Sequence, residues 1–95
     1  MEIICEGSAD EIYSKVKARM AELHAQGKIP NLKEVTYDDG ARETRVQGTG
    51  FKGKISCHEK KVVVSLDLNL LLKPMRGQIE EMILRALAKS LKIIA

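Results

Sequence analysis

The chain has 95 residues, of which 44% are hydrophobic and only 3% aromatic. It is long enough for one hydrophobic core and too apolar for a disordered chain, so we expect a single folded domain over residues 1–95. The 16 Lys and Arg residues exceed the 13 Asp and Glu residues by three. This is a smaller surplus than a dedicated nucleic-acid binder gathers on one face, and the aromatic platforms on which such proteins stack bases are also scarce.

The cysteines and the N-terminal residues bear on location. Cys5 and Cys57 lie far apart in sequence, and the residues before Cys5 have neither the basic region nor the long apolar region of a signal peptide. We therefore expect a cytoplasmic protein with free, buried thiols. No apolar run approaches the roughly 20 residues of a membrane-spanning helix, so we expect no transmembrane segment.

The first half of the chain predicts a short strand, a helix and two further strands. Residues 2–5 are β-like, and Ser8 and Glu11 have the spacing of a capping box that begins a helix. Apolar residues then recur at three- and four-residue steps until Gly27: Ile12, Val16, Met20 and Leu23. From residue 32 the period changes to two, which predicts strands over residues 32–37 and 42–47 around the turn Asp38-Asp39-Gly40.

The second half predicts two more strands and a helix. Residues 51–57 alternate apolar or small side chains with polar ones, as a half-buried strand does. Over residues 61–70, five apolar side chains face one way: Val62, Val64, Leu66, Leu68 and Leu70. Pro74 suits the first turn of a helix, whose wide apolar stripe continues to Ile94.

The order of these elements predicts the fold class. A strand, a helix, four strands joined by short turns and a final helix indicate an α+β protein with a single antiparallel sheet. We expect both helices to pack on the apolar face of that sheet, in a helix-grip-like arrangement. The other face, which carries mainly Lys, Ser, Asp and Asn side chains, should meet water.

The glycines of residues 48–53, Gly-Thr-Gly-Phe-Lys-Gly, match the dinucleotide fingerprint G-x-G-x-x-G. That motif binds a pyrophosphate where a strand turns into a helix, whereas here the chain continues as a strand. The phosphate-loop pattern fails at Ile55, which stands where Ser or Thr must hold magnesium, and the G-x-x-G loop of KH domains joins two helices. We therefore interpret Gly48 and Gly50 as turn formers, and Gly53 as room for a helix that crosses the sheet.

No pattern in the sequence points to catalysis, a metal or a cofactor. Cys57 and His58 are adjacent in a predicted strand, so they should face opposite sides, with Cys57 buried and His58 exposed. Asp38 and Asp39 fit a turn, and no Ser-His or Cys-His spacing suggests an activated nucleophile. We expect a protein that is not an enzyme.

Two sets of residues are candidate binding surfaces. Basic residues near one hairpin could meet an anionic partner: Lys52, Lys54, His58, Lys60 and Lys61. Apolar residues off the centre of the inward faces could form a dimer seam or another hydrophobic contact: Val63, Leu71, Leu84 and Ile93. A solvated sheet face and scattered surface residues are the simpler interpretations of these two sets.

Residues 50–55, Gly-Phe-Lys-Gly-Lys-Ile, and residues 71–80, Leu-Leu-Lys-Pro-Met-Arg-Gly-Gln-Ile-Glu, flank the long predicted strand. In these segments the chain resembles the polyhydroxyalkanoic acid system protein family, also called granule-region proteins. The resemblance covers about residues 8–95, and it departs from the family pattern where Tyr37 stands in the place of a Trp. It implies a small bacterial protein with a non-enzymatic, accessory or granule-associated role.

Three hypotheses follow. The first is an accessory protein, self-associating as a homodimer, that contacts a protein partner or a storage-granule surface. The second is a small ligand-binding or enzymatic domain whose sheet curls around a cavity under the last helix, in the helix-grip manner. The third, which the charge balance favours least, is weak nucleic-acid binding through the lysines near the hairpin.

Overall fold

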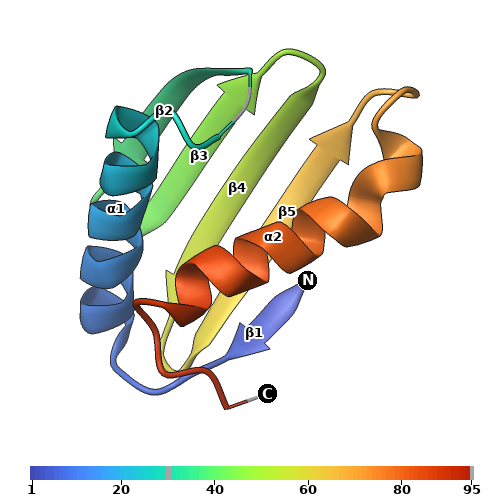
Figure 1. The fold of residues 1–95 in the computed structure, drawn as a ribbon. Coiled ribbons are helices and arrows are strands. Elements are labelled where there is room, and N and C mark those ends of the chain that lie inside the picture. Colours follow the sequence, from blue (N-terminus) through green and yellow to red (C-terminus); the bar gives the residue numbers. More distant parts are fainter. Residues whose placement is uncertain (30, 95) are drawn as a thin grey trace.

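The computed structural model describes residues 1–29 and 31–94. Its elements, in chain order, are β1 (Glu2–Ile4), α1 (Ala9–Ala25), β2 (Leu32–Asp38), β3 (Glu43–Gly48), β4 (Phe51–His58), β5 (Lys61–Leu68), a 3-10 turn η1 (Lys73–Met75) and α2 (Arg76–Ala88). The strands pair antiparallel in the spatial order β1-β5-β4-β3-β2 (Figure 1). The predicted α+β class and the single antiparallel sheet are confirmed. No helix in the described part of the chain is long and apolar enough to cross a membrane.

Helix α1 begins at the capping box that the sequence predicted. The Ser8 hydroxyl oxygen accepts a hydrogen bond from the Glu11 amide at 3.2 Å, and the Ser8 amide donates to Glu11 Oε1 at 3.4 Å. Two otherwise unpaired donors at the helix start are thereby satisfied. The predicted stripe of α1 is buried, together with Tyr13. It packs on β4 and β3.

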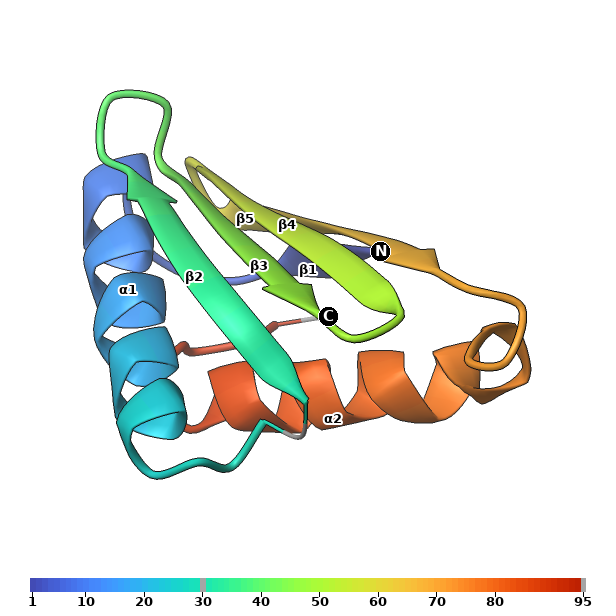
Figure 2. The ribbon, with the colours of Figure 1, turned by 90° about the horizontal axis from the view of Figure 1, so that it is seen from above.

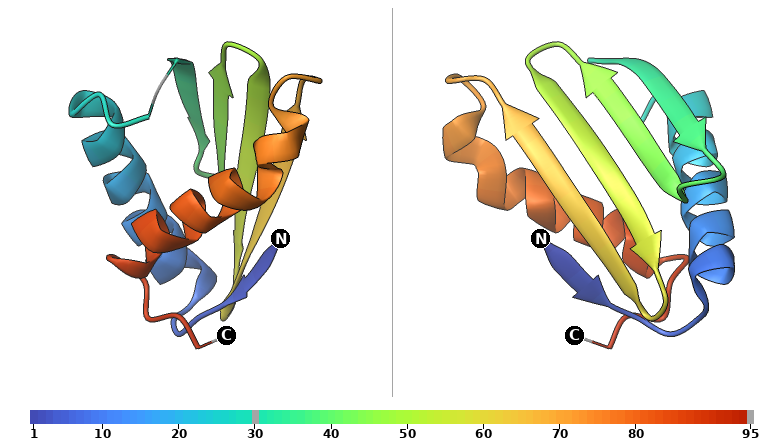
Figure 3. Two further views of the ribbon diagram at one scale, coloured as in Figure 1. Left: turned by 45° about the vertical axis from the view of Figure 1, so that its right-hand side comes forward. Right: turned by 180° about the vertical axis from the view of Figure 1, so that it is seen from behind.

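Strand register sorts the side chains of the sheet between two faces. Thr44 on β3 lies opposite Ile55 on β4, which lies opposite Val64 on β5, and all three side chains are buried beneath α1 or next to it. Residues one position away along each strand point to the other face, which no helix covers (Figure 3, right). Cys57 is buried and His58 exposed, as the alternation predicted.

Helix α2 is shorter and less buried than its apolar stripe predicted. It ends at Ala88, and residues 92–94 run beside β1 instead, where Ile93 bridges to Cys5 and the Ile94 amide donates to the Ile4 carbonyl at 2.8 Å. Leu87 is its only buried side chain. Both helices lie in front of the sheet in Figure 1, and α2 leads away from α1 (Figure 2). The predicted packing of both helices on one face of the sheet is not confirmed, and the N-terminal half of α2 buries no side chain.

The C-terminal end of α2 is the part fixed to the body of the protein. Arg19 on α1 donates from Nε to the Ala86 carbonyl at 3.1 Å, and its side chain is only 11% exposed. A cation at the C-terminus of a helix is favourable because the helix dipole leaves unpaired carbonyls there. Leu87 and Leu91 pack into the core beside this contact. The helix is therefore held at this end and runs outward from it.

Strand β5 also differs from its prediction. The expected strand over residues 61–70 stops at Leu68, and Leu70 is not inward but 82% exposed. Asn69 breaks the alternation because its side chain accepts a hydrogen bond from the Leu72 amide, which turns the chain out of the sheet. At Gly53, a Cβ would lie 2.8 Å from Val46 Cγ2 and 3.5 Å from Leu66 Cδ2, so side chains of the two neighbouring strands pack closely beside this glycine.

Candidate functional site

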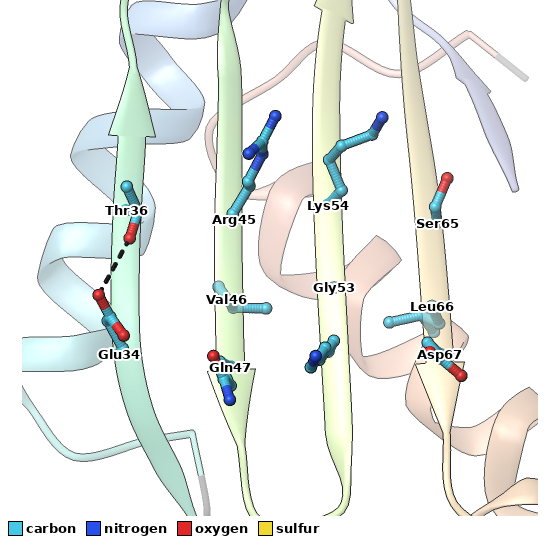
Figure 4. A pocket seen from close by; sticks show the side chains of 11 residues that line it. Glu34, Thr36, Arg45, Val46, Gln47, Gly53, Lys54, Ser65, Leu66 and Asp67 are labelled. Carbon is cyan, nitrogen blue, oxygen red and sulfur yellow. Dashed lines mark hydrogen bonds between the residues drawn. The ribbon is translucent and has the colours of Figure 1, made fainter.

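The face of the sheet away from the helices has a shallow depression of about 500 Å³. Its lining residues come from β2, β3, β4 and β5 and are drawn in Figure 4: Glu34, Thr36, Arg45, Val46, Gln47, Lys52, Gly53, Lys54, Ser65, Leu66 and Asp67. The polar members of this set alternate with residues of the core face, so the depression is the polar face of the sheet. We call it the outer depression.

Strand register places its polar side chains in two rows. Thr36, Arg45, Lys54 and Ser65 are directly opposite one another on successive strands. Since neighbouring strands are about 4.8 Å apart, this row presents hydrogen-bond donors over roughly 14 Å. The second row contains acids at both ends: Glu34, Gln47, Lys52 and Asp67.

The two cations of the first row share one counter-ion. Arg45 Nη2 lies 3.0 Å from Glu43 Oε2, and Lys54 Nζ lies 3.8 Å from Glu43 Oε1. Glu43 is only 19% exposed, whereas Arg45 is 61% exposed. The carboxylate offsets the repulsion between the two cations. The outer depression therefore presents two cations and two hydroxyl groups to solvent in its first row, with Glu43 between the cations.

The five residues of the predicted basic set lie on the same hairpin but at opposite ends of it. Lys52 and Lys54 line the outer depression, whereas His58 is six residues further along β4, about 20 Å from Lys52 at the rise of a strand. Lys61 pairs with Glu2 at 3.3 Å, and the Lys60 carbonyl and amide bond to residues between β1 and α1. The structure therefore brings only the first two together.

The four residues of the predicted apolar seam occupy different parts of the structure. Val63 lies on the outer face of β5, and Leu84 lies on α2, which is on the other side of the sheet. Ile93 is partly buried against the core beside β1. Leu71 lies in the connection between β5 and η1 and is 83% exposed. These residues do not form one continuous surface.

Leu71 nevertheless lies within an exposed apolar surface formed by other residues. Large exposed hydrophobic side chains concentrate between the end of β5 and the middle of α2: Leu70, Leu71, Met75 and Met82. Residues 69–76, which connect β5 to α2, form the outermost point of the molecule at the right of Figure 2. We call residues 69–76 the apolar corner; Met82 lies beyond it on α2. Sequence analysis placed Leu70 in the core because it continued the strand period, and so it missed this surface.

Sequence reasoning also missed a polar cluster that joins α1 to the β2–β3 turn. The Tyr13 hydroxyl donates to Asp39 Oδ1 at 2.5 Å, and Lys17 Nζ donates to the same oxygen at 2.9 Å. Lys17 also lies 5.3 Å from the centre of the Tyr37 ring, a cation-π distance. These bonds hold the pKa of the Asp39 carboxyl below its usual value, the Tyr13 bond having the larger effect. Burial, followed by the bond to Asp39, raises the pKa of Tyr13 to about 12. The cluster clamps the turn onto α1.

The two cysteine thiols, of Cys5 and Cys57, are free and buried. Burial raises the pKa of Cys57 to about 11, and burial also raises that of Cys5, so both thiols stay protonated at neutral pH. Within residues 1–29 and 31–94, no three His, Cys, Asp or Glu side chains are grouped closely enough to hold a metal ion.

Comparison with known proteins identifies the family. Searches of curated proteins and of solved structures found no match. The family model described as "Putative polyhydroxyalkanoic acid system protein" matches residues 7–91, which include every element from α1 to α2. The match extends over the outer depression and the apolar corner, so both surfaces belong to the part of the chain that the family shares. The chain therefore belongs to the polyhydroxyalkanoic acid system protein family.

Proposed function

We propose that this protein is a non-catalytic accessory protein of the polyhydroxyalkanoic acid system that attaches to the surface of polyester granules. The observation that carries the proposal is the apolar corner, where Leu70 and Leu71 are 82% and 83% exposed. Adjacent leucines as exposed as these are costly in water unless another apolar surface covers them. A polyester granule is such a surface, and the family description names this polymer.

The test is cosedimentation of the purified protein with isolated granules. The double variant Leu70→Lys/Leu71→Lys places charges at the two most exposed leucines of the apolar corner, and we expect it to remain in the supernatant while the parent protein sediments. Ile94→Lys is the matched control because Ile94 is also exposed but lies beside β1. Equal sedimentation of the parent protein and the double variant would refute attachment through this side of the molecule.

Self-association is part of the same proposal. Exposed apolar side chains on α2 would be covered equally well by a second copy of the chain. Light scattering of the parent protein and of Leu84→Lys measures this directly. A dimer that becomes a monomer on substitution supports a seam at α2, and a parent protein that is monomeric at all concentrations contradicts it.

The outer depression favours a second candidate function, weak binding of a polyanion. Its row of Thr36, Arg45, Lys54 and Ser65 presents donors at the spacing of successive strands (Figure 4). A salt titration with single-stranded DNA and RNA tests it, because phosphate binding weakens steeply as salt rises. Binding at low salt that Lys52→Gln/Lys54→Gln abolishes would support this function, and no binding at low salt would exclude it.

A further inference from the structure

The apolar corner is held in a fixed shape by its contacts with the β3–β4 hairpin. The Asn69 amide donates to the Gly50 carbonyl at 2.9 Å, and Asn69 Oδ1 accepts from the Leu72 amide at 3.0 Å. A Cβ on Gly50 would lie 2.6 Å from Asn69 Nδ2 and 3.4 Å from Leu72 Cδ1, so the corner packs closely on that hairpin. Leu72 is partly buried, unlike Leu70 and Leu71, and these contacts hold the shape without a partner.

Fixed geometry distinguishes the corner from ordinary exposed leucines. Single apolar residues scattered over a protein surface are common and do not indicate a binding site. Here Leu70 and Leu71 are adjacent, both more than 80% exposed, and Met75 follows at 45%. Because the backbone is already ordered, little conformational entropy is lost when these side chains enter another phase.

The charged residues within the corner are all basic. Residues 69–79 contain Lys73 and Arg76 and no acidic residue. Arg76 Nε lies 3.5 Å from Glu80 Oε1 one turn further along α2, yet the Arg76 side chain remains 54% exposed. Exposed leucines flanked by basic side chains match a surface with an apolar interior and an anionic boundary.

We propose that the apolar corner recognises an anionic phospholipid surface. Leu70 and Leu71 enter the acyl layer, while Lys73 and Arg76 contact the phosphate headgroups. This inference deepens the proposed function and rests on it: it names the component of the granule surface, or of a membrane facing it, to which the protein attaches. Two leucines and two cations give weak, reversible attachment, comparable with a single lipid anchor.

The experiment measures partition of the full-length protein onto sedimenting vesicles. One set contains phosphatidylglycerol mixed with phosphatidylcholine, and the other contains phosphatidylcholine alone. We expect the parent protein to bind the anionic vesicles. Leu70→Ser/Leu71→Ser should bind them about 100-fold more weakly, because two leucine side chains no longer enter the acyl layer. Ile4→Ser/Ile94→Ser, an exposed apolar pair remote from the corner, should bind like the parent protein.

A charge variant separates the two parts of the proposal. Lys73→Gln/Arg76→Gln should bind anionic vesicles about 30-fold more weakly at low salt and should bind neutral vesicles as the parent protein does. The control Lys60→Gln/Lys61→Gln changes the net charge equally at the opposite end of the β4–β5 hairpin and should have little effect. Far-ultraviolet circular dichroism of every variant shows that the fold is retained.

The outcomes distinguish this inference from the proposed function. Binding to bare polyester particles but not to anionic vesicles would overturn the phospholipid inference and leave granule attachment standing. Equal binding to neutral and anionic vesicles would refute the role of Lys73 and Arg76. Binding to anionic vesicles that is insensitive to Leu70→Ser/Leu71→Ser would refute insertion of the corner. Binding to vesicles without binding to granules would refute the proposed function instead.

Discussion

Replacing Thr44 with valine should stabilise the protein. Thr44 lies on β3 between Tyr37 and Ile55, it is 0% exposed, and its hydroxyl oxygen has no hydrogen-bond partner among the described residues. A buried hydroxyl without a partner costs about 1–3 kcal/mol, because its bonds to water are lost on folding and not replaced. Valine has nearly the same shape and suits a strand, so we expect the free energy of unfolding to rise by about 1 kcal/mol.

Urea unfolding followed by circular dichroism measures this change, since the chain has no Trp for fluorescence. For a domain of this size, 1 kcal/mol corresponds to a melting temperature about 4–8 °C higher. Thr44→Ser is the matched control: it keeps the hydroxyl and removes a buried methyl group, so it should lose about 1 kcal/mol. A loss of 1 kcal/mol or more in Thr44→Val would refute the reasoning, because it would mean that the hydroxyl makes a hydrogen bond in the folded state.

Three further predictions concern ionisation and packing. Tyr13 should ionise near its raised pKa of about 12, so the stability that its neutral hydroxyl contributes is complete below pH 10.0 and is lost as the pH rises from 10.0 toward 12. The difference in tyrosinate absorbance between the parent protein and Tyr13→Phe measures this pKa, and an ordinary pKa for Tyr13 would contradict the prediction. Because Cys57 is buried and its pKa is raised, its thiol should react slowly with a thiol reagent at mildly alkaline pH and quickly once denaturant is added. Immediate reaction of Cys57 in buffer would contradict this prediction. Gly48→Ala should lower the free energy of unfolding by about 1–3 kcal/mol, since the new Cβ would lie 2.5 Å from a main-chain oxygen. Gly77→Ala should raise the free energy of unfolding by about 0.5–1 kcal/mol, because Gly77 is in a helix and its Cβ would have nothing within 4 Å. Equal effects of the two substitutions on urea unfolding would contradict this packing.

Features that depend only on residues close together in the sequence could be predicted. The capping box of Ser8 and Glu11 and the alternation around Ile55 are local patterns, and they set the start of α1 and the faces of β4. The antiparallel pairing of β4 with β5 also follows from a local feature, because strands joined by the two-residue connection Glu59-Lys60 can pair only in that direction, whereas the order of the strands in the sheet could not be predicted.

Features that depend on distant contacts could not be predicted in this way. The apolar stripe predicted the last helix to continue to Ile94, but residues 92–94 run beside β1, where Ile93 pairs with Cys5 near the other end of the chain, and no local signal shows this. Tyr13 meets Asp39 across 26 residues for the same reason. The candidate site was found only in part: Lys52, Lys54 and Leu71 were predicted, whereas Leu70 was placed in the core because Asn69 ends β5 by a side-chain bond that the period does not reveal.

The position of β1 beside β5 has a consequence for the order of folding. The Met1 ammonium group donates to the Val64 carbonyl, 63 residues later, and residues 92–94 complete the same edge of the sheet. During synthesis β1 leaves the ribosome before every other strand, yet it can pair only after β5 has emerged and folded against β4. Closing so long a loop is slow, so we expect this edge to form late, after the β2–β5 meander and α1 have already built a nucleus.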